Sequence, residues 1–176
     1  MSYIYELPFG RGQRFASGAA GLVEKLLGGW QIAGITTFQT GLSQSVAVLQ
    51  DRCNCDSTPG TRLRADATGI RPELDHPTPD RYFNTDAFRL PPQFSFGNSG
   101  RGVLTMPGLN NFDFSVLKNF RIRESHALQF RAEFFNWFNH TQFGEPNVRV
   151  DDRNFGRIGS LLTPSRQVQF GLRYEF

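Results

Sequence analysis

The chain has 176 residues, 39% hydrophobic and 20% charged, which is the composition of a globular domain rather than of a disordered segment. Its 18 Phe need an apolar surface to cover them, while 18 Gly and 10 Pro suit a chain with many turns. No apolar run reaches the roughly 18 residues of a transmembrane helix. The 17 Arg and 2 Lys are spread along the chain, a distribution that gives no support to nucleic-acid binding.

The N-terminal part predicts two strands with a short helix between them. Residues 2–9 alternate between apolar and polar positions, which indicates a short strand. Residues 16–28 carry Leu and Val at helical spacing, with Ser17 as the expected N-cap and two glycines as the stop. Residues 30–49 are rich in β-branched side chains and contain no proline, so they predict a long strand, or two strands in series, with a kink or bulge at Gly41.

The middle of the chain predicts one large loop followed by a strand. Residues 50–108 lose all periodicity and are rich in Pro, Gly, Asp and Asn, which is typical of a loop without regular structure. Alternation returns in residues 111–120, where Phe112, Phe114 and Val116 share one face. The chain is expected to turn at residues 121–125.

The C-terminal part predicts two more strands, separated by a second loop. Residues 127–136 alternate, with an apolar row on one face and polar side chains on the other. Residues 139–165 are again rich in Gly, Asn, Asp and Pro and predict a long loop. Residues 166–176 alternate to the end of the chain, and no polar residue interrupts their apolar row. The fold class expected from these segments is all-β and antiparallel.

The alternating strands fit a transmembrane β-barrel, with the apolar rows toward lipid and the polar rows toward the lumen. Their length suits a tilted crossing of a bilayer. An Arg that faced lipid at the midplane would cost about 2–4 kcal/mol, so the charged side chains of the last two strands are expected in the lumen. These predicted lumen-facing residues are Arg131, Glu133, Arg173 and Glu175. The predicted lipid-facing row of the last strand is Val168, Phe170, Leu172, Tyr174 and Phe176.

Five strands can be placed across a membrane with the chain end in the periplasm, so that residues 50–108 and 139–165 are extracellular. Aromatic side chains then collect at the two interfaces, as a barrel girdle requires. The girdle predicted in this way comprises Trp30 and Phe120 on the periplasmic side, and Phe134, Phe135, Trp137 and Phe138 on the outer side. Because a closed barrel needs about eight strands, five predict only a segment of a larger barrel. A soluble, secreted β-sandwich binding module is the alternative.

Residues that could carry chemistry do not form a recognisable site. Cys53 and Cys55 are too close in sequence for an easy disulfide and too few for a metal site. His76, His126 and His140 show no ligand spacing, and no nucleophile has a paired base in the sequence. We therefore expect no enzyme activity, no catalytic residue, no metal and no cofactor.

Four segments resemble the C-terminal end of TonB-dependent outer-membrane receptors, specifically the Oar-like branch. They are LLGGWQIAGITTFQTG, NSGRGVLTMPGLNNFDFSVLKNFRI, RAEFFNWFNHTQFGEPN and the terminal QVQFGLRYEF, which together extend over nearly the whole chain. The terminal row that ends in Phe176 is similar to the signal by which the outer-membrane assembly machinery recognises barrel proteins.

This resemblance implies a location in the outer membrane of a Gram-negative type of bacterium and a barrel of about 22 strands, the size of the plugged transporters. It further implies a plug domain, a segment that engages TonB, and energised transport of a ligand that the sequence does not identify. This chain corresponds to a fragment of such a receptor, so transport is expected only of the full-length protein. The partners implied are outer-membrane lipid, the barrel assembly machinery and, through missing N-terminal parts, the TonB complex.

Overall fold

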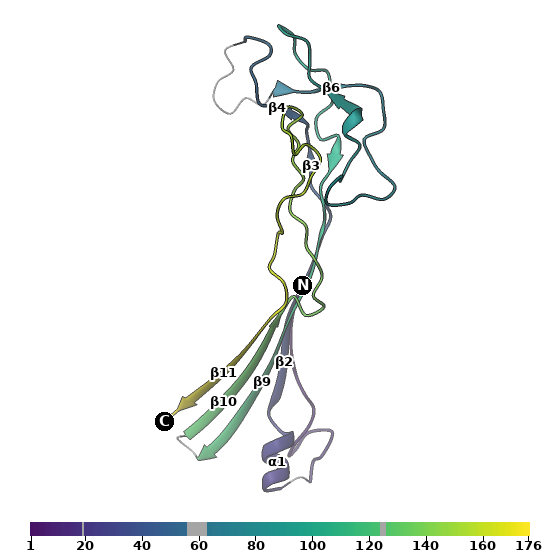
Figure 1. The fold of residues 1–176 in the computed structure, drawn as a ribbon. Coiled ribbons are helices and arrows are strands. Elements are labelled where there is room, and N and C mark those ends of the chain that lie inside the picture. Colours follow the sequence, from purple (N-terminus) through teal and green to yellow (C-terminus); the bar gives the residue numbers. More distant parts are fainter. Residues whose placement is uncertain (19, 56–62, 124–125) are drawn as a thin grey trace. The chain divides into compact units, whose positions relative to one another are not determined.

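The computed structural model of the chain describes residues 1–18, 20–55, 63–123 and 126–176 (Figure 1). These residues form two compact units. The sheet unit comprises Met1–Phe38, Asn110–Thr141 and Pro164–Phe176, and the loop unit comprises Gln39–Leu109 and Gln142–Thr163.

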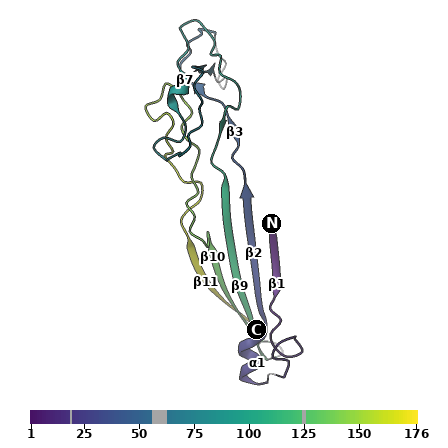
Figure 2. The same cartoon turned by 90° about the vertical axis from the view of Figure 1, so that its right-hand side faces the viewer.

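The sheet unit is an antiparallel sheet of five strands, in which neighbours in the sheet are also successive long strands of the chain (Figures 1 and 2). Its strands are β1 (Ser2–Glu6), β2 (Trp30–Gln39), β9 (Leu109–Arg123), β10 (His126–Phe135) and β11 (Gln167–Glu175). The predicted all-β, antiparallel fold class is therefore confirmed. The order β1-β2-β9-β10-β11 is that of a meander, the strand arrangement of up-and-down barrels.

Two of the strands differ clearly from the predicted ranges. The range 30–49, predicted as one long strand or two in series, is divided: β2 ends at Gln39, and two strands of two residues each follow at Ser43–Gln44 and Ala47–Val48. Beyond β2, an added Cβ at Gly41 would overlap the main chain of Met106, so the backbones of residues 41 and 106 approach more closely than any side chain allows. In contrast, β9 is longer than the predicted 111–120 because polar residues at both ends still fit the pleat.

The helix between β1 and β2 is shorter than predicted. Helix α1 comprises Leu22–Leu27, and its N-cap is Gly21, with no side-chain cap, instead of the expected Ser17. The predicted stop is confirmed, since Gly28 is the C-cap and Gly29 has a positive φ of 72° that favours glycine. No helix in the described residues has the length and apolar character needed to cross a membrane.

The two ends of the sheet differ in how the strands are connected. Helix α1 joins β1 to β2 at one end, and the short link between β9 and β10 lies at that same end. Residues 124 and 125 of the predicted turn are outside the described residues. Both long connections, from β2 to β9 and from β10 to β11, leave from the opposite strand ends. This alternation of short and long connections is typical of outer-membrane barrels.

The loop unit corrects the prediction of loops without structure, because both long connections fold around a hydrophobic core. Three two-stranded pairs are formed by β3 (Ser43–Gln44) with β8 (Leu104–Thr105), β4 (Ala47–Val48) with β5 (Leu63–Arg64), and β6 (Asp66–Ala67) with β7 (Phe88–Arg89). A 3₁₀ turn, η1 (Thr85–Ala87), precedes β7. The buried core includes Val46, Leu63, Phe83, Phe88, Leu104 and Met106.

The second long connection is an integral part of this core. Phe155 packs edge-on against Phe83, with ring centroids 5.1 Å apart. The amide of Ala47 donates to the carbonyl oxygen of Val148 at 2.9 Å. The carboxylate of Asp151 accepts hydrogen bonds from the amides of Leu49 and Gln50 at 2.9 to 3.0 Å. The two connections therefore fold as a single unit.

Candidate functional site

The register of β9, β10 and β11 gives this part of the sheet one apolar and one polar face. Across β10 and β11, Phe130 lies opposite Leu172 and Phe134 opposite Val168. On β9, the partners of these same β10 residues are Lys118 and Phe114. The predicted row Val168, Phe170, Leu172 and Tyr174 lies on this apolar face, and the side chains of all four are exposed. Phe176 follows β11 and stacks on Tyr174 at 6.0 Å.

The opposite face carries the four charged residues that the sequence predicts for a lumen. Arg173 lies opposite Gln129, and Glu133 lies opposite Gln169. Ion pairs join Arg131 to Glu133 at 3.6 Å and Arg173 to Glu175 at 2.9 Å, each within one strand. The structure therefore brings Arg131, Glu133, Arg173 and Glu175 together on one face, while their position in a lumen stays a prediction.

Hydrogen bonds between polar side chains cross this face from strand to strand. Gln31 donates to Glu6 at 2.9 Å, and Gln129 donates to Asn119 at 3.0 Å. Gln169 donates to Glu133 between the last two strands. A groove of about 480 Å³ runs over this surface on β10 and β11. It is lined by Gln129, Arg131, Glu133, Gln169 and Arg173, and by Phe170, Gly171 and Leu172 between the last two. Such a surface suits contact with water or with a polar ligand.

Aromatic rings cluster at the end of the sheet from which the long connections leave. Phe134 and Trp137 meet edge-on at 4.6 Å, and Phe112 and Phe138 meet at 4.9 Å. Phe38 and Phe114, which the sequence analysis did not assign to a girdle, extend the same cluster. The assignment of Phe135 to this girdle is wrong. Consecutive strand residues point to opposite faces, and the register partner of Phe135 is Gln167, on the polar face.

The opposite end of the apolar face holds a lysine between two aromatic rings. Lys118 Nζ lies 5.1 Å from the centre of the Trp30 ring and 5.0 Å from that of Phe120. Lys118 is 1% exposed. Its ammonium group donates to the carbonyl oxygens of Leu26, at 3.1 Å, and Gly28. Trp30 and Phe120, two of the predicted girdle residues, thus surround a charged contact with the end of α1.

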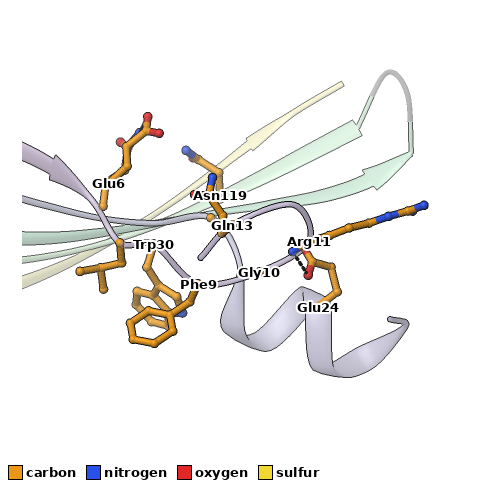
Figure 3. A pocket seen from close by; sticks show the side chains of 11 residues that line it. Glu6, Phe9, Gly10, Arg11, Gln13, Glu24, Trp30 and Asn119 are labelled. Carbon is orange, nitrogen blue, oxygen red and sulfur yellow. Dashed lines mark hydrogen bonds between the residues drawn. The ribbon is translucent and has the colours of Figure 1, made fainter. Parts of the chain in front are cut away.

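A small cavity of about 170 Å³ lies beside this end of the sheet (Figure 3). Glu6, Gln13 and Asn119 line one part of it, and Phe9 and Trp30 lie next to each other on another. The amide of Arg11 donates to Glu24 at 2.6 Å. Within this lining, Gln31 donates to Glu6 and Arg11 to Glu24, and the second of these bonds links the chain before α1 to the helix.

Asn136 is a residue whose role the sequence analysis missed. It follows β10 with a positive φ of 51° and is buried. Its amide donates to Asp113 at 3.0 Å, while its side chain donates to His140 at 2.9 Å and to Pro164 at 3.3 Å. Asn adopts a positive φ more readily than most residues do. An Asn within a run of aromatic residues is therefore a signal from which a turn at this position could have been predicted. Asn136 therefore orients the chain as it leaves β10.

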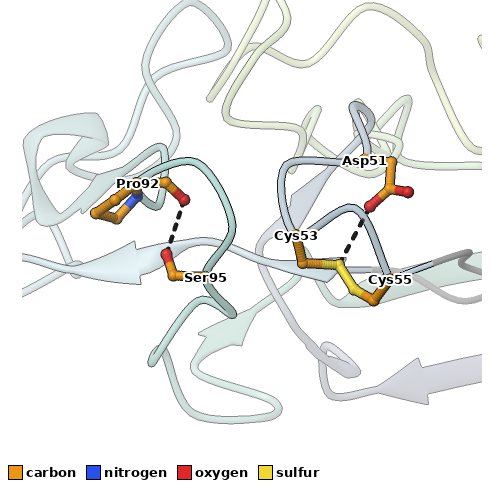
Figure 4. Close-up of a disulfide and its surroundings, with 5 residues drawn as sticks. All are labelled: Asp51, Cys53, Cys55, Pro92 and Ser95. Carbon is orange, nitrogen blue, oxygen red and sulfur yellow. Dashed lines mark hydrogen bonds between the residues drawn. A yellow bond between two sulfur atoms is a disulfide. The ribbon is translucent and has the colours of Figure 1, made fainter.

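The expectation that Cys53 and Cys55 form no easy disulfide is wrong (Figure 4). Asn54 between them has a positive φ of 50°, and this turn brings the two Cα atoms to 5.2 Å, within the ordinary range for disulfides. Asp51 Oδ1 lies 3.1 Å from Cys53 Sγ. In the described residues these three side chains form a group that could hold a metal ion, but the disulfide occupies both sulfur atoms.

Two groups of the loop unit have shifted pKa values. Burial raises the pKa of the Tyr82 hydroxyl. Hydrogen bonds from the amide of Asn154, at 2.8 Å, and from the Asn147 side chain lower the pKa of Asp152. Of the three histidines, His126 lies on β10 with Nδ1 2.7 Å from the Tyr174 hydroxyl, whereas His76 and His140 are exposed. The structure does not bring the three histidines into one cluster.

Comparison with known proteins agrees with the two-faced sheet. The family model described as "Outer membrane beta barrel domain" matches residues 1–169. No curated protein matches the chain at a significant level. No solved structure does so either.

Proposed function

Because the chain belongs to the outer membrane β-barrel domain family and is an outer-membrane protein, we propose that it forms the C-terminal part of a TonB-dependent, Oar-like receptor barrel. The family membership decides against the alternative of a soluble, secreted β-sandwich. Energised transport of a ligand is then an activity of the complete receptor. We assign this chain no enzymatic role.

The observation that carries the proposal is the separation of the sheet into one apolar and one polar face, combined with an apolar row on the last strand. Phe170 and Leu172 are each 70% exposed on one face of β11, a surface that lipid covers in a barrel. The polar face carries Arg131 and Arg173 with their acidic partners, which suits a water-filled or plugged lumen.

The loop unit supports a receptor rather than a simple pore. Both long connections leave the same strand ends and share a core, so they form one folded surface that a ligand can contact. The four sequence segments that resemble Oar-like receptors include the strands that hold this unit. We infer that the loop unit selects the ligand, whose chemical class the described residues do not define.

Three partners follow from the proposal. Lipid of the outer membrane covers the apolar face, and the assembly machinery recognises the row from Val168 to Phe176. The TonB complex acts through the receptor's plug and TonB-binding segment, which belong to the N-terminal parts of such proteins. Since five strands are too few to close a barrel, further strands of the same receptor pair with the free edges of β1 and β11.

The first experiment is to sequence the gene upstream of the codon for Met1 and to express the complete reading frame. The proposal expects a continuous frame that encodes more strands and a plug, and a product that binds the periplasmic domain of TonB in a pull-down assay. The same barrel with its TonB-binding segment deleted is the matched control. A stop codon directly upstream, or equal binding by the control, would contradict the receptor assignment.

A further inference from the structure

The segment between β1 and β2 exposes an unusual amount of apolar surface. Leu22 is 78% exposed and Leu26 is 64% exposed, and α1 has no buried residue. Phe9 and Phe15, whose rings lie 5.6 Å apart, are also exposed. A helix that packs on its own domain buries its apolar face, whereas this helix does the reverse.

The inward side of the segment is instead polar and closely packed. Glu24 points back toward the chain that precedes the helix, where it accepts a hydrogen bond from the amide of Arg11 (Figure 3). Gly10 and Gly28 are buried, and an added Cβ at Gly10 would lie 2.8 Å from the Cα of Gly28. Close backbone contacts and the carboxylate of Glu24 therefore fix the orientation of the helix, in which the leucines point outward.

Lys118 and Trp30 attach this helix to the apolar face of the sheet. The carbonyl oxygen of Leu26, in the last turn of α1, accepts hydrogen bonds from Trp30 Nε1 at 2.8 Å and from Lys118 Nζ at 3.1 Å. Both donors belong to the apolar face. The last turn of α1, which carries the exposed Leu26, is therefore attached to the apolar face at the end of the strands.

We propose that α1, together with Phe9 and Phe15, forms an interfacial anchor, whose apolar side chains insert into the phospholipid leaflet on the periplasmic side of the outer membrane. The inference rests on the proposed orientation of the apolar face toward lipid, because the leaflet that covers that face also reaches the helix. The segment carries Arg11, Arg14 and Lys25 against a single acid, Glu24, which is turned inward. An apolar surface rimmed by basic groups fits anionic phospholipid at the headgroup boundary.

Spin labels on the full chain in vesicles of phosphatidylethanolamine and phosphatidylglycerol test the anchor. Single cysteines are introduced by Leu22→Cys or Leu26→Cys in a Cys53→Ser, Cys55→Ser background. Collision with oxygen, which partitions into lipid, is compared with collision with a water-soluble nickel chelate. Labels at Phe170→Cys, on the proposed lipid face, and Glu73→Cys, on the exposed surface of the loop unit, are the lipid and water references.

The anchor predicts an oxygen-to-nickel ratio at positions 22 and 26 that is several-fold above that of the Glu73 reference and close to that of Phe170. Labels whose ratio matches that of the Glu73 reference overturn the anchor. Labels that neither oxygen nor the nickel chelate reaches also overturn it, and they indicate that a protein partner covers α1. If the Phe170 label also reports water, the orientation of the whole face is wrong.

Lys118→Met provides a second measurement, because it removes the donor that holds α1 and keeps an unbranched apolar stem. In this variant the label at position 26 should become more accessible to nickel, while the Phe170 label should not change. An unchanged label at position 26 would contradict the role of Lys118 in positioning α1.

Discussion

Phe170 on β11 lies directly opposite Ala132 on β10, and Phe170 is 70% exposed while Ala132 is 5% exposed. The ring of Phe170 also stacks on Phe130, with centroids 6.2 Å apart. A small residue opposite a large one allows the ring to lie over the sheet and to present a continuous apolar surface.

We expect Phe170→Arg to block stable insertion, because a charge on the lipid face near the midplane costs about 2–4 kcal/mol. Gln169→Arg is the matched control on the next residue, where Glu133 offers a carboxylate to the new cation. The measurement is the fraction of protein that resists urea extraction from isolated outer membranes. Equal losses for the two variants would count against the assignment of the two faces.

Deletion of Phe176 should reduce the yield of inserted protein and leave the strands themselves unchanged. Phe176 lies beyond β11, and within the described residues its side chain touches the ring of Tyr174 and is otherwise 92% exposed. Its loss therefore removes little packing but shortens the row that the assembly machinery is proposed to recognise. The rate of assembly in cells is the readout, and a normal rate would remove this role from Phe176.

Asp151→Ala should loosen the loop unit, because the amides of Leu49 and Gln50 lose their acceptor. Hydrogen bonds to a charged group contribute about 1.5–3 kcal/mol each in favourable cases, and solvent exposure here places the expected loss at the low end. Limited proteolysis of residues 40–109 measures the effect. Asp75→Ala, at an exposed position, is the control, and equal cleavage of both variants would contradict the proposed link.

The segment 142–163 should lose stability at low pH through Asp152. Hydrogen bonds from Asn154 and Asn147 lower the pKa of this carboxyl in the folded state. A lowered pKa means that the stabilisation is fully present above the unfolded value of about 3.9 and is lost as the pH falls through the lower, folded value. Proteolysis with an acid-active protease across this window measures the loss. Asp152→Asn should flatten this part of the profile, and an unchanged profile would refute the assignment.

The strands of the sheet could be predicted because the alternation of apolar and polar residues is visible within each strand alone. The alternation of Phe112, Phe114 and Val116 reports a half-covered face without any knowledge of the neighbouring strands. The same two-residue period assigns the side chains of each strand to the two faces of the sheet. Phe135 was assigned to the girdle by its neighbours in the sequence, although the period places it on the polar face.

The loop unit could not be predicted because its fold depends on contacts between residues that are far apart in the sequence. Its strands have two residues each, too few to show a period, and its core joins Val46 to residues as distant as Phe83 and Phe155. The Cys53 disulfide depends on the backbone of Asn54, which spacing alone does not reveal. Likewise, Lys118 interrupts an apolar row, and its contacts with the end of α1 and with the rings of Trp30 and Phe120 explain why a charge is stable there.

The shared core of the two long connections also limits how the loop unit can be exchanged between related barrels. A chimera that grafts residues 40–109 alone would leave Phe83 without Phe155, and Leu49 without the carboxylate of Asp151. Recombination that preserves folding must therefore transfer both connections as a pair, although 32 residues, 110–141, separate them in the gene. Under the proposed function, in which the loop unit selects the ligand, a change of ligand therefore requires matched changes in both connections.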